Sequence, residues 1–252
     1  IWGYKVDGLF RNDKEAAEYA SRIDLSTVAS GYYTATGAYG KGVRGGDIKY
    51  LDLNGDNIVN GGKGTLDDPG DRRVIGNSSP RYQYGASLNF SWYGFDVSVF
   101  MQGIGRLDWY PGADNLRFWG PYCRPYATFV PKNFMSQVWS EENPDAYFPR
   151  ARAYTSLNSN SGTAYYTNDR YLQNLAYCRL KNLTIGYTIP RRLTSKVGIK
   201  ECRIYFSGEN LATWSALKSD FLDPEQAAAD SDKKANVYPW CKTYSIGLNL
   251  TF

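Results

Sequence analysis

The chain has 252 residues, a net charge of +4 and no histidine, and 16% of its residues are aromatic. The lack of histidine excludes Ser-His-Asp and Cys-His catalysis and histidine-ligated metals, and the balanced charge is not typical of a nucleic-acid-binding protein. No apolar run approaches the roughly 20 residues of a transmembrane helix. Abundant aromatic residues and 25 glycines favour a β fold, because aromatic side chains fit pleated strands and glycine fits turns.

Residues 1–80 are rich in glycine, tyrosine and turn-forming polar residues. Good helix formers over 13–21 follow Asn12, a favourable N-cap residue, and predict one short helix. Residues 52–80 contain many Asp, Asn, Gly and Pro residues, which indicates turns. We therefore expect residues 1–80 to form a loop region. The chain starts at Ile1 with neither an initiator methionine nor a signal peptide, so we expect a mature, processed or partial chain.

Apolar and polar residues alternate in five segments, a pattern typical of β-strands with one apolar and one polar face. The first segment spans Arg81–Trp92, and a tight turn at Tyr93-Gly94 leads into the second, which begins at Phe95. The other three begin near residues 174, 201 and 238, and the last ends at Phe252. The alternation changes phase near Lys181-Asn182, which predicts a β-bulge there.

The connections between these segments are alternately short and long. Long connections cover residues 104–170 and 214–237, and a helix over 132–140 is predicted in the first. Strands of about 10–15 residues with such connections are typical of outer-membrane β-barrels, whereas soluble β-sandwiches have shorter strands. A bacterial barrel needs at least about eight strands. Residues 81–252 are therefore expected to be the C-terminal strands, with long loops, of a larger all-β transmembrane antiparallel barrel.

The alternation also assigns a direction to each side chain of such a barrel, since lipid-facing and lumen-facing residues alternate. The residues expected to face lipid are Tyr84, Leu88, Val97, Val99, Ile185, Ile204, Ile246 and Leu248. The residues expected to face the lumen are Gln83, Ser87, Asn89, Arg203 and Glu209.

A series of short motifs runs through most of the chain. In order they are Asp47–Asp56, Asp71–Asn77, Tyr93–Gly103, Trp139–Asp145, Phe148–Arg150, Arg179–Pro190, Ser207–Leu211, Asp223–Glu225 and Gly247–Phe252. Together they resemble the C-terminal barrel region of SusC/RagA-like, TonB-dependent outer-membrane transporters. Each motif alone is weak, and the common order makes the resemblance specific. The first 46 residues match more loosely.

The resemblance implies the fold and function of the whole protein. Such transporters have a 22-strand barrel, a plug and a TonB box at the N-terminal end, and a SusD-like surface lipoprotein as a lid. They are not enzymes: they import glycans or peptides across the outer membrane of Gram-negative bacteria with energy relayed by TonB. Barrel C-termini lie on the periplasmic side. Residues 1–80, 104–173 and 213–237 are then expected outside the cell, where substrate and lid are met.

Aromatic and basic residues in the first long loop are candidates for contact with an oligosaccharide or oligopeptide, because they stack on sugars or hydrogen-bond peptides. The candidates are Trp109, Tyr110, Trp119, Tyr122, Arg124 and Tyr126. The alternative is that these side chains pack the long loop against itself.

A calcium-like pattern lies in the N-terminal loop region. Its candidate ligands are Asp52, Asn54, Asp56, the Ile58 carbonyl, Asn60 and Asp71. The first five have the spacing that opens a calcium loop. Lys63 occupies the position of the usual last ligand, and 61–70 looks like an insertion relative to the family pattern, so Asp71 is expected to supply the missing carboxylate. The alternative is an Asx-rich turn without a metal.

The end of the chain resembles the signal that the outer-membrane assembly machinery reads. The residues that form it are Tyr244, Ile246, Leu248, Leu250 and Phe252. Two functional hypotheses remain open besides the transporter. One is a soluble secreted β module that binds calcium and glycans, and the other is a secreted hydrolase, which is disfavoured because no catalytic constellation is present.

Overall fold

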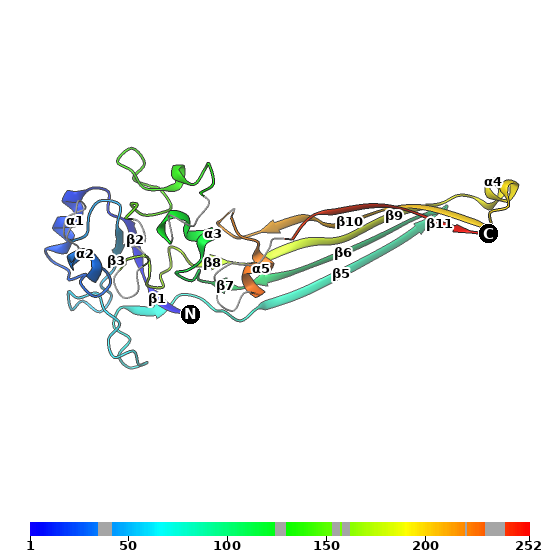
Figure 1. Cartoon of the computed structure of the whole chain (residues 1–252). Coiled ribbons are helices and arrows are strands. Elements are labelled where there is room, and N and C mark those ends of the chain that lie inside the picture. The colour runs from blue at the N-terminus through cyan, green and yellow to red at the C-terminus, as the bar shows by residue number, and fades with distance from the viewer. Residues whose placement is uncertain (35–41, 124–129, 153–156, 158–161, 220, 230–239) are drawn as a thin grey trace. The chain divides into compact units, whose positions relative to one another are not determined.

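A computed structural model describes residues 1–34, 42–123, 130–152, 157, 162–219, 221–229 and 240–252 (Figure 1). The described residues form two compact units, and the chain passes between them more than once. The first unit consists of the described parts of Ile1–Ser78 and Asp108–Gln173. The second consists of the described parts of Ser79–Leu107, Asn174–Ala229 and Val237–Phe252.

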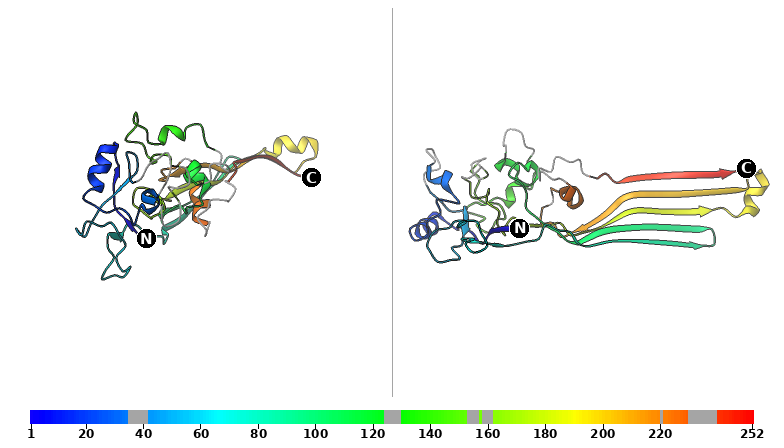
Figure 2. Two further views of the ribbon diagram at one scale, coloured as in Figure 1. Left: turned by 60° about the vertical axis from the view of Figure 1, so that its left-hand side comes forward. Right: turned by 90° about the horizontal axis from the view of Figure 1, so that it is seen from below.

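The second unit is built on five long strands, as the alternation predicts. They are β5 (Arg81–Trp92), β6 (Phe95–Arg106), β9 (Tyr177–Thr188), β10 (Glu201–Ser215) and β11 (Thr243–Thr251). All neighbours are antiparallel, and the strand order is β11-β10-β9-β6-β5 (Figure 2). The sheet is open: within the described residues, β5 pairs only with β6 and β11 only with β10. The prediction of five antiparallel strands is confirmed, whereas closure into a 22-strand barrel stays a prediction.

Two local features of the sheet were predicted and are confirmed. Tyr93 and Gly94 have φ values of 46° and 86°, which is the left-handed pair that a type I′ hairpin turn requires. In β9, Asn182 pairs with Phe100 and Leu180 with Met101, so that Lys181 is an extra residue on its strand. Lys181 is thus the bulge at which the alternation changes phase.

The two faces of the sheet differ in chemistry, and Phe100, which pairs with Ser87 and Asn182, is an apolar exception on the polar face. One row across all five strands is Phe90, Val97, Ile185, Phe206 and Ile246. The next row, on the opposite face, is Asn89, Ser98, Thr184, Ser207 and Ser245. The register therefore places the residues predicted to face lipid on one face and those predicted to face the lumen on the other.

The first unit contains short elements around an aromatic core. The strands are β1 (Trp2–Tyr4), β2 (Val6–Leu9), β3 (Ile48–Tyr50), β4 (Arg72–Val74) and β7 (Asp108–Trp109), and β8 (Gln173–Asn174) lies at the unit boundary. β1 pairs with β4, and β2 pairs with β3. Phe118, Trp119, Tyr122, Phe134 and Phe148 are buried and contact one another edge-on or stacked. These rings form an aromatic cluster within the core, since large aromatic side chains bury much apolar area.

The helices are short. They are α1 (Asp13–Ala20), α2 (Ser30–Thr34), α3 (Leu116–Trp119), α4 (Arg191–Thr194) and α5 (Pro224–Ala229), with 3₁₀ turns at Gly120–Tyr122, Met135–Gln137 and Ser195–Val197. Among the described residues, no helix has the length and apolar character needed to cross a membrane. The α1 prediction is confirmed, and the Asn12 side chain accepts a hydrogen bond from the Glu15 amide at 2.9 Å, as an N-cap should.

The prediction of a helix over 132–140 is wrong, since only Met135–Gln137 is helical and forms a 3₁₀ turn. The Trp139 amide donates to the Phe148 carbonyl at 3.0 Å, and the Phe148 amide donates to the Gln137 carbonyl at 2.8 Å. Pairing with a segment about ten residues away thus replaces the helical hydrogen bonds.

Candidate functional site

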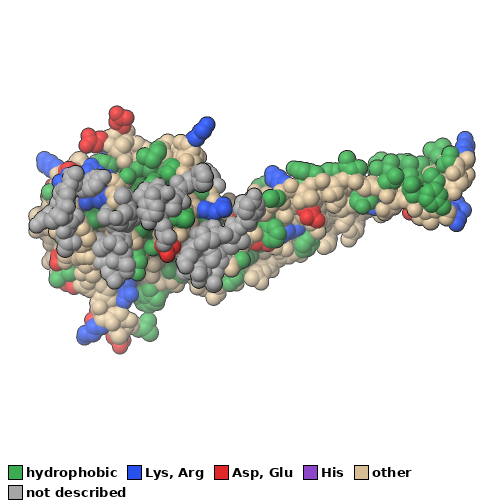
Figure 3. Space-filling model, in the orientation of Figure 1, with side chains coloured by type: hydrophobic (Ala, Val, Ile, Leu, Met, Phe, Trp, Pro, Cys, Tyr) green, Lys and Arg blue, Asp and Glu red, His purple; other side chains and the backbone are tan. Residues whose placement is uncertain are grey.

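Most of the apolar face of the five-stranded sheet is exposed, although Cys202 is buried. The exposed fractions of Leu88, Ile246 and Leu248 are 65%, 84% and 56%. In the space-filling view, hydrophobic side chains form a band along the sheet toward the end that bears α4 (Figure 3). Soluble proteins rarely leave a contiguous apolar surface of this kind uncovered, so the face requires an apolar environment. The residues of the predicted assembly signal lie in β11 or directly after it, and Tyr244, Ile246, Leu248, Leu250 and Phe252 are all exposed.

The polar face carries an ion pair that crosses three strands. Arg203 of β10 donates two hydrogen bonds to Asp96 of β6, at 2.9 and 2.5 Å, and it crosses Gly186 of β9. A Cβ atom on Gly186 would lie 2.5 Å from both partners, so only glycine leaves room for the pair. The polar face thus accommodates charged groups, whereas the paired rows of the opposite face contain no charged residue within the described strands.

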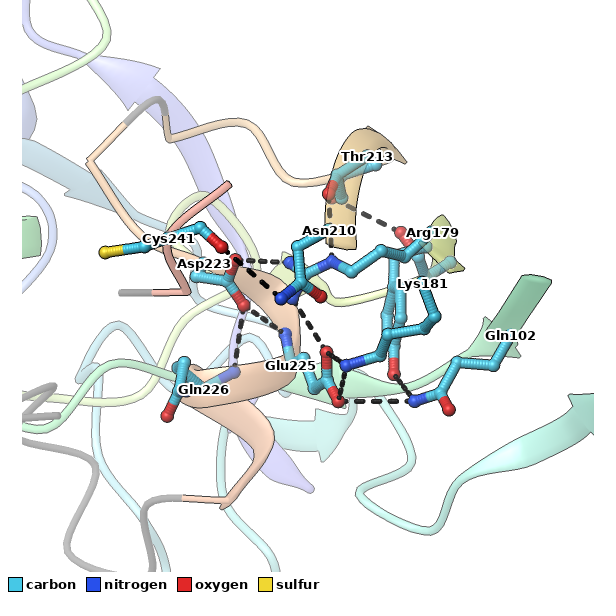
Figure 4. A network of polar contacts seen from close by, with 12 residues as sticks. Gln102, Arg179, Lys181, Asn210, Thr213, Asp223, Glu225, Gln226 and Cys241 are labelled. Carbon is cyan, nitrogen blue, oxygen red and sulfur yellow. Dashed lines mark hydrogen bonds and ion pairs between the residues drawn. The ribbon is translucent and has the colours of Figure 1, made fainter. Parts of the chain in front are cut away.

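Four charged residues fasten the segment after β10 to this polar face, and we call them the ionic latch: Arg179, Lys181, Asp223 and Glu225 (Figure 4). The guanidinium of Arg179 is buried, with 1% of its side chain exposed. It donates to Glu225 at 2.7 Å, to Asp223, and through Nε to Thr213 Oγ1 at 2.9 Å. Every nitrogen of the buried guanidinium therefore has a partner.

Lys181 and Gln102 complete the contacts of the Glu225 carboxylate. Lys181 Nζ lies 2.8 and 2.9 Å from its two oxygens, and Gln102 Nε2 donates to it at 3.2 Å. Lys181 Nζ also lies 4.7 Å from the centre of the Trp240 ring. The second acid of the latch, Asp223, accepts the amides of Glu225 and Gln226 at 3.0 and 3.1 Å and so starts α5. Two positive and two negative charges balance, and the latch holds α5 against the sheet.

The bulge at Lys181 makes the latch possible. Side chains alternate strictly along an unbroken strand, so Arg179 would share the apolar face with Ile185, six positions away. The extra residue shifts the phase, and Arg179 instead pairs with Gln102 and Thr213 on the polar face. Lys181 itself reaches the same carboxylate as Arg179.

The sequence motifs contain all four latch residues, but local pattern does not reveal that they meet. The contacts join positions that are 44 to 46 residues apart in the chain. The change of phase at Lys181 was the one local signal, since it indicates that the side chains before it change face.

The loop predicted to bind calcium is held together by its own backbone. The Asp52 carboxylate accepts the amides of Gly55 and Asn57 at 2.7 and 2.8 Å, and Asp56 accepts the amide of Ile58 at 2.8 Å. The bond from Ile58 to Asp56 is an Asx turn, in which an acidic side chain accepts the amide two residues on, whereas the Asp52 bonds reach amides three and five residues on. These bonds all lie within residues 52–58. They bring the carboxylates of Asp52 and Asp56 into one short loop, as the calcium pattern requires.

Asp71 joins the two ends of this loop. Its side chain is fully buried, and its carboxylate accepts the amides of Leu53, Asn54 and Asn60 at 2.7, 3.3 and 2.8 Å. The predicted last ligand therefore serves as an anchor for the loop backbone. In the part of the chain that the structure describes, no group of three or more Cys, Asp or Glu side chains is arranged to hold a metal ion. Calcium binding stays a prediction.

The residues predicted to contact substrate are in the core of the first unit. Trp109, Tyr110, Trp119 and Tyr122 have at most 7% of their surface exposed. Tyr122 donates to the Pro149 carbonyl at 2.6 Å, and burial raises its pKa far above the ordinary value. Their positions are those expected of loop packing. Arg124 and Tyr126 lie outside the described residues, and contact with substrate stays a prediction for the whole set.

Tyr110 is also part of the wall of a cavity in the first unit. The cavity measures about 560 Å³, and Trp2, Tyr4, Arg72 and Tyr166 contribute to its lining. This volume is within the range of small-ligand pockets, which is roughly 300–1,000 Å³. The Tyr110 hydroxyl donates to the Tyr166 carbonyl at 3.1 Å, so its hydrogen-bonding position is fixed by the protein.

Comparison with known proteins identifies similar sequences. No protein-family profile matches the chain. TonB-dependent receptor P26 of Formosa agariphila is 28% identical over 215 residues, and TonB-dependent receptor P3 of the same organism is 27% identical over 217. Each match covers 82% of this chain, and the chain spans about a fifth of the length of these relatives (20% and 19%).

Solved structures agree on the fold. A chain of the RagAB peptide transporter matches the whole of this chain with a TM-score of 0.58 and 19% identity, and the match covers 22% of that chain. The RagAB peptide importer in its 'open-open' state matches with a TM-score of 0.55 and 18% identity, again over 22% of that chain. TonB-dependent receptors are outer-membrane proteins of Gram-negative bacteria and transporters rather than enzymes, and this chain is similar in sequence and fold to a part of such receptors.

Proposed function

We propose that the chain is a segment of the barrel of a TonB-dependent outer-membrane transporter that imports oligopeptides or glycans. The single observation that carries the proposal is the five-stranded antiparallel sheet with one continuous exposed apolar face and two open edges. In lipid, the apolar face contacts acyl chains and the polar face lines the lumen. Further strands of the same barrel pair with β5 and β11, since unpaired backbone groups in hydrocarbon cost several kcal/mol each.

The remaining parts of the transporter are proposed by analogy with the family. They are the rest of the barrel, a plug, a TonB-contacting segment at the N-terminal end, and a SusD-like lipoprotein on the outer surface. The RagAB relatives support a peptide as substrate, since they are described as a peptide importer and transporter. The ionic latch then holds the 221–229 segment on the lumen-facing side of the sheet.

The alternative is a soluble secreted module that binds calcium and glycans. A soluble module must cover its apolar surface, and Leu88, Phe90, Ile246 and Leu248 are at least 56% exposed. This observation favours the transporter, because scattered apolar residues are normal on a soluble surface whereas a continuous face is not.

Extraction of the full-length protein separates these two functions. Cells that express it are fractionated, and the membrane is washed with high salt and then with detergent. The transporter is expected in the outer-membrane fraction, to require detergent, and to migrate differently on gels before and after boiling. Release by salt alone, with identical migration in both samples, would contradict the proposal and favour the soluble module. A lipoprotein that co-purifies after mild detergent extraction identifies the proposed lid.

We also propose a structural calcium ion at the loop that contains Asp52 and Asp56. Calcium takes six to eight oxygen ligands, and the side chain–backbone hydrogen bonds of Asp52 and Asp56 keep several candidate oxygens in one loop. Calcium at about millimolar concentration should then protect the loop from protease, and chelator should reverse the effect. The variant with Asp52→Ala and Asp56→Ala should not respond. An equal digestion rate with calcium and with chelator would contradict calcium binding, and an Asx-rich turn without a metal would be the remaining interpretation.

A further inference from the structure

A basic turn with exposed apolar side chains closes the end of the sheet between β9 and β10. Arg191, Arg192, Lys196 and Lys200 lie within residues 190–200, and the same stretch contains no acidic residue. The side chains of Arg191, Arg192 and Lys196 are exposed and form no ion pair with the described residues. The turn therefore carries an uncompensated positive charge.

The turn is ordered rather than loosely attached. The Lys200 amide donates to the Thr251 carbonyl at 2.8 Å, and its ammonium donates to the Phe252 carbonyl at 2.7 Å. The Ile199 amide donates to the Thr194 carbonyl at 3.2 Å, and Gly198 closes the turn with a φ of 78°. These bonds attach the backbone of the turn to the last strand and hold Lys200 against its end.

Exposed apolar residues also lie in the turn itself. Leu193 and Val197 are 59% and 72% exposed, although they lie on a turn that is otherwise polar. The β5–β6 turn lies at the same end, because the Thr188 amide donates to the Gly94 carbonyl at 2.7 Å. Trp92 and Tyr93 at that turn are 62% and 85% exposed. In Figure 3, basic side chains stand at the tip where the hydrophobic band ends.

We propose that the turn Pro190–Lys200 is a docking surface for the headgroups of anionic phospholipids. The apolar side chains enter the acyl region, the aromatic residues lie at the interface, and the cations contact phosphate. The proposal rests on the proposed function, which places this end of the sheet at the periplasmic leaflet, where phospholipids are found. Binding relies on the attraction between the basic side chains and the anionic headgroups. The docking surface lies at the end of the lipid-facing sheet, next to the membrane.

The test uses the full-length transporter that contains this chain, reconstituted in nanodiscs of phosphatidylcholine with a minor fraction of phosphatidylglycerol. The variant replaces Arg191, Arg192 and Lys196 by glutamine. The control replaces three exposed basic residues of the first unit, Lys14, Arg22 and Lys132, by glutamine and so makes the same change in net charge. Lipid that remains bound after transfer to detergent is quantified by native mass spectrometry, and boiling-dependent migration confirms that each barrel is folded.

The wild-type protein and the control should retain phosphatidylglycerol in preference to phosphatidylcholine. In the turn variant this preference should fall by about fivefold per charge removed, since each cation at an anionic lipid surface contributes about 1 kcal/mol. An unchanged preference in the turn variant, or an equal loss in the control, would overturn the proposal. A protein that folds without detergent would overturn the proposed function as well, and extraction reveals that before any lipid is measured.

Discussion

Replacement of Glu225 by glutamine tests whether the ionic latch holds α5 against the sheet. Glutamine keeps the shape of the side chain and removes its charge. Arg179 then keeps one carboxylate partner, Asp223, while Lys181 loses its anionic partner and one of its two oxygen contacts at 2.8 and 2.9 Å. One side-chain oxygen also becomes an amide group that donates, and it faces donors from Arg179, Lys181 or Gln102.

The size of the effect follows from the burial of the partners. Arg179 is 1% exposed and Lys181 15%, whereas Glu225 itself is 22% exposed and reached by solvent. Hydrogen bonds to charged groups contribute about 1.5–3 kcal/mol each, and loss of one partner of a fully buried pair costs about 3–5 kcal/mol. Because solvent reaches Glu225, we expect a smaller loss, about 2–3 kcal/mol. This corresponds to roughly 30- to 150-fold more frequent opening of the segment.

Hydrogen–deuterium exchange of the 221–229 peptide measures this opening directly. Glu209→Gln is the matched control, because Glu209 is an exposed acid on the polar face of β10 and forms no ion pair with the described residues. The double variant with Lys181→Gln should exchange less than the sum of the two single effects predicts, since the residues interact directly. Exchange of 221–229 in Glu225→Gln at the wild-type rate would refute the reasoning, because the latch would then contribute nothing.

Three further predictions follow from other parts of the chain. Leu248→Arg should destabilise the barrel by about 2–4 kcal/mol, whereas Asn249→Arg on the opposite face should be tolerated. Refolding equilibria in lipid vesicles measure the free energy of unfolding of both variants, and equal losses would contradict the assignment of faces. Deletion of Phe252 should lower the amount of the full-length protein in the outer membrane, as quantified in membrane fractions, and normal amounts of folded barrel would count against an assembly signal. Burial raises the pKa of Asp47 to about 6. The stability that the protonated Asp47 carboxyl contributes is fully present below about pH 4 and is lost as the pH rises through about 6. The melting temperature of the wild type should therefore fall over this pH range, and that of Asp47→Asn should not.

The strands of the second unit could be predicted because alternation is a local property. Arg81–Trp92 is found with the predicted bounds, and the change of phase at Lys181 marks the bulge. Successive side chains of a strand point to opposite faces of the sheet, so the alternation alone assigns each residue to a face, without knowledge of the more distant strands. The helix over 132–140 was wrong for the opposite reason, since Trp139 pairs with Phe148 and tertiary pairing outweighs helix propensity.

Long-range side-chain contacts could not be predicted from local pattern. Arg179 and Glu225 are 46 residues apart, and only the fold brings their charges together. The aromatic residues of the first long loop show a related limit. Trp119 and Tyr122 belong to residue types that serve equally as ring-stacking ligand contacts and as core, and their burial in the first unit is decided by partners such as Phe148.

The environment of the two faces of β5 tests the central claim most directly. Spin labels are placed singly at Ser87, Leu88, Asn89 and Phe90 of the full-length protein in native outer membrane, and their collision rates with oxygen and with a water-soluble nickel chelate are measured. Labels at 88 and 90 should be exposed to oxygen and shielded from nickel, and labels at 87 and 89 should show the reverse. Equal nickel access at all four positions, or shielding of 88 and 90 from both reagents, would contradict a lipid-facing sheet.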